Sequence, residues 1–185
     1  MIKKEDGDYL INIAKESIET YVKKDIKINP PEDCPDNLKE NLGVFVTLNK
    51  NNNLRGCIGY PEPIMPLING VIDSAISAAI NDPRFPEVSE NELHELEYEI
   101  TVLTKPELIK VEKVEDYPKK INIGEDGLII EKGFFKGLLL PQVATEYNMK
   151  SEEFLTQTCI KANISPNAWL NEKVDIYKFQ GKIFK

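Results

Sequence analysis

The stretch GVFVTLNKNNNLRGCIGY, residues 43–60, decides the fold. Its first six residues are dominated by β-formers, and the asparagine-rich residues 49–53 that follow tolerate the left-handed conformations of a tight turn. Residues 54–60 then have the composition of a returning strand. Because two strands joined by a short turn pair in opposite directions, the stretch predicts an antiparallel β-hairpin.

Helical patterns are predicted on both sides of this hairpin. Prolines at 61, 63 and 66 stop the second strand, and apolar residues then recur at helical spacing from Leu67 to Ile80. This helix should end at Asp82-Pro83, because a residue before proline is pushed out of the helical region. Upstream, an amphipathic pattern predicts a helix that begins after an N-cap at Asp8 and ends near Asp25.

The rest of the chain continues the mixture of short strands and irregularly placed helices. This arrangement predicts the α+β class, with an antiparallel sheet flanked by helices, rather than regular βαβ winding. The further expected elements are a short helix capped by Ser89 and Glu92, strands over 98–103, 128–131 and 134–140, a helix opened by Pro141, a helix capped by Ser151 and closed by Asn163, and a final strand over 174–179.

Length and charge restrict the class of protein. A chain of 185 residues with 41% apolar and 29% charged residues fits one globular domain, residues 1–185, with room for two subdomains. Its net charge of -8 would repel a phosphate backbone, and the lysines are scattered rather than clustered. Nucleic acid is therefore not favoured as a partner.

Location and cofactors are predicted from what the pattern lacks. The N-terminus becomes acidic at once, and no apolar run approaches the length of a signal peptide core or a membrane span, so we expect a cytoplasmic protein with no membrane contact. The three cysteines, Cys34, Cys57 and Cys159, are too far apart for a zinc motif, and the one histidine, His94, is interpreted as a surface residue. No disulfide, metal or cofactor is expected.

Arginine usage is the sharpest compositional signal. Of the 23 basic residues only two, Arg55 and Arg84, are arginines. Lysine cannot replace the planar, forked guanidinium at bidentate sites, so both positions are candidate ligand-binding residues. Arg84 lies in the stiff loop Asp82–Pro86, which can position functional groups, and the alternative is an Asp82–Arg84 ion pair that only clamps the turn.

Cys57 is the candidate nucleophile. On a strand Arg55 and Cys57 point to the same face, and a nearby guanidinium favours the thiolate. Gly56 and Gly59 would let a ligand or another backbone approach closely. The alternative is a packed cysteine between glycines. If the strand over 98–103 joins the same sheet, Glu99 would supply a counter-charge at this face.

Three segments resemble the signature segments of the AMMECR domain family, which is named after a human chromosomal region linked to Alport syndrome, midface hypoplasia and elliptocytosis. The resemblance covers nearly the whole chain and is carried by Leu54–Gly59, Asp82–Pro86 and Gly137–Ala144, supported by Glu99–Leu103, Phe154-Leu155, Cys159 and Trp169. It departs from the pattern at Asn148-Met149, where Gly-Trp is expected, and at Asn163, where glycine is usual.

The resemblance implies a compact α+β domain of two unequal lobes around an antiparallel sheet, in a microbial cytosolic protein. It implies no particular reaction, and the functional residues of the family are inferred mainly from the segment that here contains Arg55 and Cys57. Proteins of the Memo family and radical-SAM enzymes often accompany family members, which indicates a shared pathway.

Two functional hypotheses follow. The first is a binding or adaptor module for a small anionic ligand or a protein partner, with ligand-binding candidates Arg55, Gly56, Gly59, Asp82, Arg84, Glu99 and Gln142. The absence of a histidine base beside the thiol favours it. The second is an enzyme in which Cys57 is the nucleophile and Arg55 activates it or holds an anion.

Overall fold

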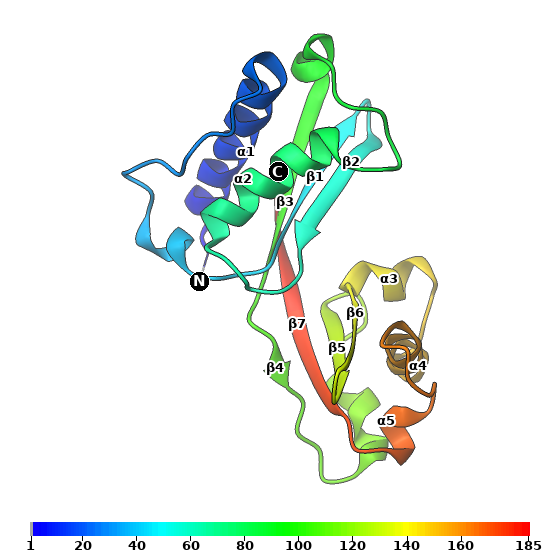
Figure 1. The fold of residues 1–185 in the computed structure, drawn as a ribbon. Helices are drawn as coiled ribbons and strands as arrows, with labels where there is room; N and C mark the ends of the chain where they lie inside the picture. Colours follow the sequence, from blue (N-terminus) through cyan, green and yellow to red (C-terminus); the bar gives the residue numbers. More distant parts are fainter. Residues whose placement is uncertain (1) are drawn as a thin grey trace. The chain divides into compact units, whose positions relative to one another are not determined.

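In the computed structural model, which describes residues 2–185, the chain divides into two compact units (Figure 1). The first unit runs up to Leu103 and includes Lys182–Lys185, and the second is Thr104–Gly181. Each unit has its own cluster of buried apolar side chains. Each is therefore described separately.

The first unit is built on the predicted hairpin. Strands β1 (Val44–Lys50) and β2 (Asn53–Tyr60) pair antiparallel, and Asn51 and Asn52 between them have φ of 52° and 61°. The prediction of an asparagine turn is thus confirmed. Strand β3 (Leu96–Leu103) pairs antiparallel with the other side of β1, which gives the order β2-β1-β3. Strand β2 is consequently an edge strand.

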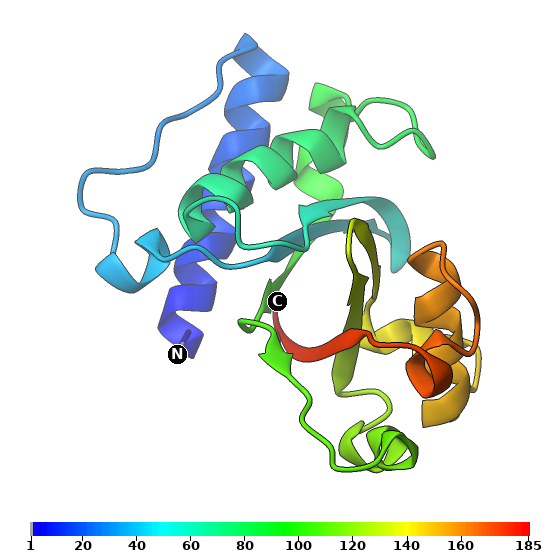
Figure 2. The same ribbon diagram turned by 60° about the horizontal axis from the view of Figure 1, so that its bottom comes forward.

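Two helices, α1 (Lys4–Lys24) and α2 (Leu67–Ile80), cover one face of this sheet (Figures 1 and 2). Alternate residues of β1, among them Val46 and Leu48, are buried against the helices, while Phe45 and Thr47 are only half-buried on the other face. We call that second face, which carries the side chains of Thr47 and of its neighbours across the sheet, the open face. The remaining elements of the unit are the 3₁₀ helices η1 (Asp36–Lys39) and η2 (Glu90–Glu95).

The predicted ends of the helices are partly confirmed. Helix α1 ends at a left-handed Asp25, as expected, and α2 ends before Asp82-Pro83. The N-cap prediction at Asp8 is wrong: α1 begins one turn earlier, after Lys3, because the Asp6 carboxylate accepts the backbone N–H of Lys3 at 2.7 Å and satisfies that helix end. The capping box of Ser89 and Glu92 opens η2 as predicted.

The second unit is built from antiparallel strands with helices packed on them. Its strands pair in the order β4-β7-β5-β6, and β7 continues into the first unit at its C-terminal end. Pro141 opens α3 as predicted, whereas α4 starts at Ser151 itself with Lys150 as its N-cap. The elements are β4 (Glu107–Leu108), η3 (Val114–Lys120), β5 (Asp126–Lys132), β6 (Phe135–Leu139), α3 (Pro141–Glu146), α4 (Ser151–Lys161), α5 (Ala168–Asn171) and β7 (Asp175–Phe184).

These elements confirm the α+β class, since the strands within each unit pair antiparallel and the helices are irregularly interposed. Cys159 and Trp169 are buried in the core of the second unit. None of the described helices is both long and apolar enough to cross a membrane. The single-domain interpretation of residues 1–185 stays a prediction.

Candidate functional site

Gly56 is the position at which α2 meets the edge strand. A Cβ atom built on Gly56 would overlap the backbone carbonyl oxygen of Ala78, closer than the 3.0 Å that real Cβ atoms keep. Only glycine lets the helix backbone lie directly on β2 here. Of the two partners expected for this glycine, a ligand or a backbone, the structure shows a backbone.

Arg55 is fully engaged with the segment that joins α2 to η2. Its Nε and Nη2 donate to the two carboxylate oxygens of Glu92 at 3.1 and 3.2 Å, and its remaining donors reach the carbonyl oxygens of Pro86 at 2.9 Å and Glu87 at 3.3 Å. The side chain is 11% exposed. Bidentate pairing combined with two backbone acceptors is the use of arginine that lysine cannot reproduce. Arg55 therefore fastens a loop.

Glu92 is the residue at which three stabilising contacts converge. Besides Arg55, it accepts the backbone N–H of Ser89 at 3.1 Å and pairs with Lys50 at 3.2 Å. The hydrogen bonds from Arg55, and then that from Ser89, lower the pKa of the Glu92 carboxyl to about 2. At neutral pH the carboxylate is charged, and the clamp on Arg55 is complete.

Asp82 and Arg84 close the free edge of β2. The Asp82 carboxylate accepts the backbone N–H of Cys57 at 2.9 Å, and Arg84 Nη2 donates to the carbonyl oxygen of Cys57 at 3.2 Å. The two side chains also pair with each other at 2.7 Å. The hydrogen bonds from Arg84 hold the pKa of Asp82 well below its usual range. The pair thus occupies the backbone N–H and C=O groups of Cys57, which an edge strand would otherwise offer to another chain.

The thiol of Cys57 lies on the open face, in a row of polar side chains that crosses three strands. Thr47 on the central strand β1 is opposite Cys57 on β2 and opposite Glu99 on β3. Its hydroxyl donates to Cys57 Sγ at 3.2 Å. Glu99 pairs with Lys185 at 2.8 Å. We call Cys57, Thr47 and Glu99 the polar row. Its members are neither sealed in the core nor fully exposed.

The structure separates Arg55 from Cys57 more than the simple strand pattern predicts. The pairing of β1 and β2 is irregular between Leu48 and Asn49, where Asn49 faces Leu54 and Arg55 becomes an extra residue. The hydrogen bonds of the two side chains share no partner. Arg84 is the guanidinium that interacts electrostatically with Cys57, although Asp82 is the main cause of the raised pKa of Arg84.

The other predicted residues divide between the two units. Gly59 leaves room for the ring of Phe45, and its Cβ would also overlap the Val44 carbonyl oxygen. Gln142 is exposed at the start of α3 in the second unit. Thr47 and Glu92 were missed as site residues, although the alternation of β1 places Thr47 beside Phe45 on one face and the capping box already marked Glu92.

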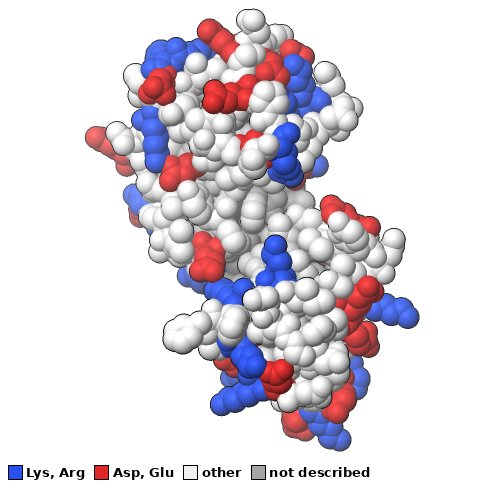
Figure 3. Space-filling model, turned by 45° about the vertical axis from the view of Figure 1, so that its right-hand side comes forward, with Lys and Arg blue, Asp and Glu red and all other residues white. Residues whose placement is uncertain are grey.

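The polar row brings together a thiol, a hydroxyl and a carboxylate, which can bind a polar ligand through hydrogen bonds. His94 lies on η2, on the surface as predicted. Within residues 2–185 no group of three or more His, Cys, Asp and Glu side chains is placed to hold a metal ion. Charges of both signs are interspersed over much of the face drawn in Figure 3.

Comparison with known proteins gives consistent results. A family model described as AMMECR1 matches residues 11–184. A protein of Methanothermobacter thermautotrophicus is 48% identical over 183 residues, which cover 99% of this chain and 95% of that protein, and one of Thermococcus onnurineus is 51% identical over 189 residues, covering 100% and 92%. The crystal structure of an uncharacterized protein from Pyrococcus horikoshii matches with a TM-score of 0.83 and 49% identity, covering 98% of this chain and 92% of that one.

Proposed function

The chain belongs to the AMMECR1 family, and from this premise we propose that it is a binding module whose ligand or protein partner contacts the open face of the β2-β1-β3 sheet. The names of the relatives quoted above state no activity, so the proposal is based on the geometry of this chain. A cytoplasmic location is part of the same proposal.

The observation that carries the proposal is that some groups of β2 have partners within the fold, whereas the side chain of Cys57 lies on the open face. Arg55, Gly56 and the backbone of Cys57 all have partners within the fold. In the polar row the side chains of Thr47 and Cys57 are hydrogen-bonded to each other, Glu99 is paired with Lys185, and all three are half-buried. A half-buried polar surface next to an aromatic ring is typical of a ligand site.

The contacts of Arg55 change which residues are expected to bind an anionic ligand. Arg55 would have to release Glu92 or two backbone carbonyl groups to hold an anion. Arg84 is 54% exposed and Lys185 is 73% exposed, so these two cations at the ends of the polar row are the ones that an anionic group would reach. Both already have a carboxylate partner, and a ligand with donors as well as acceptors fits this face best.

The second candidate is an enzyme that uses Cys57 as a nucleophile. The thiol is half-buried on the open face, the hydroxyl of Thr47 donates to its sulfur, and Arg84 Nη2 donates to the carbonyl oxygen of the same residue. The rate at which iodoacetamide alkylates Cys57, measured against pH in a variant that lacks Cys34 and Cys159, tests it. A reaction that follows a thiol titrating near 8.5 would count against the enzyme, and one that persists at clearly lower pH would support it.

The binding proposal is tested by retention of small molecules and proteins from cell extract. We expect the wild-type protein to retain compounds or chains that Thr47→Val and Glu99→Gln each lose, because the two changes remove hydrogen-bonding groups from the open face without altering the core. Glu16→Gln, an exposed position on α1, is the matched control and should retain them. Retention that is the same in all four proteins would contradict the proposal.

A further inference from the structure

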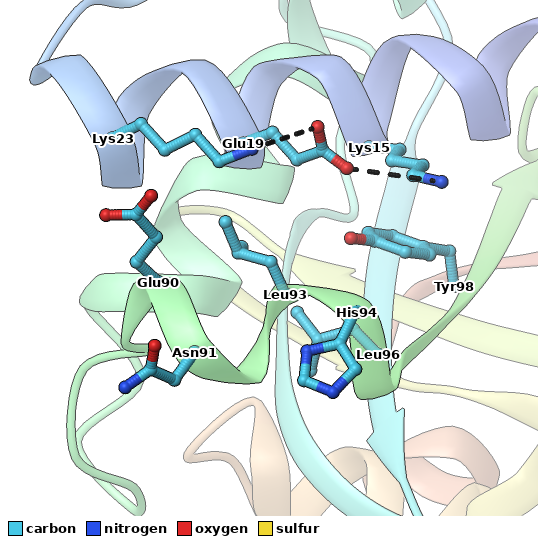
Figure 4. Close-up of a pocket in the computed structure, with 9 residues that line it drawn as sticks. All are labelled: Lys15, Glu19, Lys23, Glu90, Asn91, Leu93, His94, Leu96 and Tyr98. Atoms are coloured by element: carbon cyan, nitrogen blue, oxygen red, sulfur yellow. Dashed lines mark ion pairs between the residues drawn. The ribbon is translucent and has the colours of Figure 1, made fainter.

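A cleft separates α1 from η2 in the first unit, with a volume of about 720 Å³. Figure 4 shows side chains from the two helices facing each other across it. This volume is within the range of roughly 300–1,000 Å³ that holds small molecules in proteins. The cleft is on the helix-covered side of the sheet, because Tyr98 at its floor is opposite the buried Leu48. It is therefore separate from the polar row, and its role does not rest on the proposed function.

The α1 wall of the cleft carries an excess of positive charge. Lys15, Glu19 and Lys23 follow one another at intervals of four residues, and Glu19 is 4.0 Å from the ammonium of Lys15 and 3.6 Å from that of Lys23. One carboxylate thus serves two ammonium groups at long distances. Both lysines are accessible, with side chains 54% and 41% exposed.

The η2 wall carries the opposite charge. Glu90 is exposed beside Asn91, and among residues 2–185 no cation forms an ion pair with Glu90. The ion pairs of the cleft remain on the α1 wall and do not cross to η2 (Figure 4). Two walls of opposite charge that are not paired with each other leave a place for a molecule that carries both charges.

The floor of the cleft is apolar apart from one hydroxyl group. Leu93 and Leu96 are buried, with 6% and 8% of their surfaces exposed. The hydroxyl of Tyr98 is inaccessible and has no hydrogen-bond partner among the described residues, and Figure 4 shows it pointing toward the space between Glu19 and Leu93. Burial, and then the charge of Glu19, raise the pKa of Tyr98 to about 12. The hydroxyl is a protonated donor that lacks an acceptor. A buried donor of this kind destabilises the fold unless another group accepts its hydrogen bond.

From these three surfaces we propose that the cleft binds a small zwitterion with an apolar side chain, an amino acid or a short peptide. Its carboxylate is paired with Lys15 and Lys23, and it accepts a hydrogen bond from Tyr98 when the side chains that cover this hydroxyl in the unliganded protein move aside. Its ammonium group is paired with Glu90 and donates to the side-chain carbonyl of Asn91. The apolar side chain covers Leu93 and Leu96, which gives the molecule three contacts of different chemistry.

The probes are L-leucine, the dipeptide leucyl-leucine and two single-charge analogues of leucine. Isoamylamine lacks the carboxylate, and 4-methylpentanoate lacks the ammonium group. Each is titrated into the full-length protein labelled with ¹⁵N, and amide chemical shifts are followed. We expect leucine or the dipeptide to shift amides of α1, η2 and the start of β3, and each analogue to bind about fivefold more weakly, since an ion pair between accessible groups contributes up to about 1 kcal/mol.

Variants test the contacts one at a time. Lys23→Gln and Glu90→Gln should each weaken binding by about fivefold. The neighbouring exposed positions on α1 supply matched controls, Lys24→Gln and Glu16→Gln, which should bind as the wild type does. Tyr98→Phe should also weaken binding, yet it should raise the melting temperature of the unliganded protein, because it removes a buried donor without a partner.

Tyr98→Phe is expected to lower the affinity for the ligand and to raise the melting temperature of the protein. Because these two changes have opposite signs, the variant tests the proposal even if other variants fail to fold. The proposal is overturned if neither leucine nor its dipeptide shifts amides at the cleft, if the single-charge analogues bind as tightly, or if the control variants weaken binding as much as Lys23→Gln does. A ligand found on the open face alone would support the proposed function and would overturn this one.

Discussion

The two sides of strand β2 differ in how many of their polar groups and close contacts are already occupied by partners within the fold. On the edge and helix side, Arg55 is fastened to Glu92, Gly56 contacts α2, and Asp82 and Arg84 hold the backbone of Cys57. On the open face the thiol contacts Thr47. The difference teaches that Arg55 and Gly56 are occupied by contacts within the fold, whereas the thiol of Cys57 lies half-buried on the open face.

Gly56→Ala should have the largest effect on this comparison. Its new methyl group would overlap the Ala78 carbonyl oxygen, and a helix backbone cannot move aside as a side chain can, so we expect a loss of about 3 kcal/mol or more in the free energy of unfolding. Urea denaturation measures it. Gly133→Ala is the control, because Gly133 has φ of 58° but nothing within 4 Å of a new Cβ, and it should cost only about 1–2 kcal/mol. Equal losses would show that no close contact exists at Gly56.

Asp82→Asn should come next. The Asp82 side chain is 2% exposed, and both of its oxygens accept from donors, so an amide nitrogen in place of one oxygen would face N–H groups. We expect a loss of about 3 kcal/mol in urea denaturation. The matched change Asp36→Asn breaks an ion pair with Lys39 at a carboxylate that is 97% exposed, and it should leave the urea denaturation curve almost unchanged. A small loss at Asp82 would mean that the edge of β2 is not held there.

Glu92→Gln should give a smaller loss that depends on pH. Because the pKa of Glu92 falls from 4.5 to about 2 on folding, its contribution to stability is present above pH 4.5 and is lost as the pH falls toward 2. We expect the variant to be about 2 kcal/mol less stable at neutral pH, with the difference vanishing near pH 2. Urea denaturation across this range measures it, and a difference from the wild type that is as large at pH 2 as at neutral pH would contradict the prediction.

Cys57→Ser should have the smallest effect. Its hydroxyl is on the half-buried open face and can still accept from Thr47, so we expect a change of less than about 1 kcal/mol in the free energy of unfolding. Cys159→Ser places the same hydroxyl in the fully buried core of the second unit, where it should cost about 1–3 kcal/mol. If Cys57→Ser destabilised the protein as much, Cys57 would be a packing residue and the open face would lose its candidate group.

Local sequence patterns were sufficient to predict much of the fold. The asparagine turn, the hairpin, the buried helix over Leu67–Ile80 and the capping box at Ser89 depend on residues close together in the chain, and all are confirmed. The start of α1 was not predicted, because the choice among several acidic residues near the N-terminus depends on which carboxylate reaches a free N–H group, and Asp6 also accepts from the distant Asn37.

The sequence by itself determined the α+β class and the family. It also singled out the two arginines in a chain whose other basic residues are lysines. Only the tertiary structure decided what those arginines do, because hydrogen-bond partners 27 to 37 residues away in the chain are not encoded in any local pattern. The irregular pairing at Asn49 likewise takes Arg55 out of the alternation that would have aligned it with Cys57. Burial and pairing depend on which surfaces meet, and they meet only when the chain has folded.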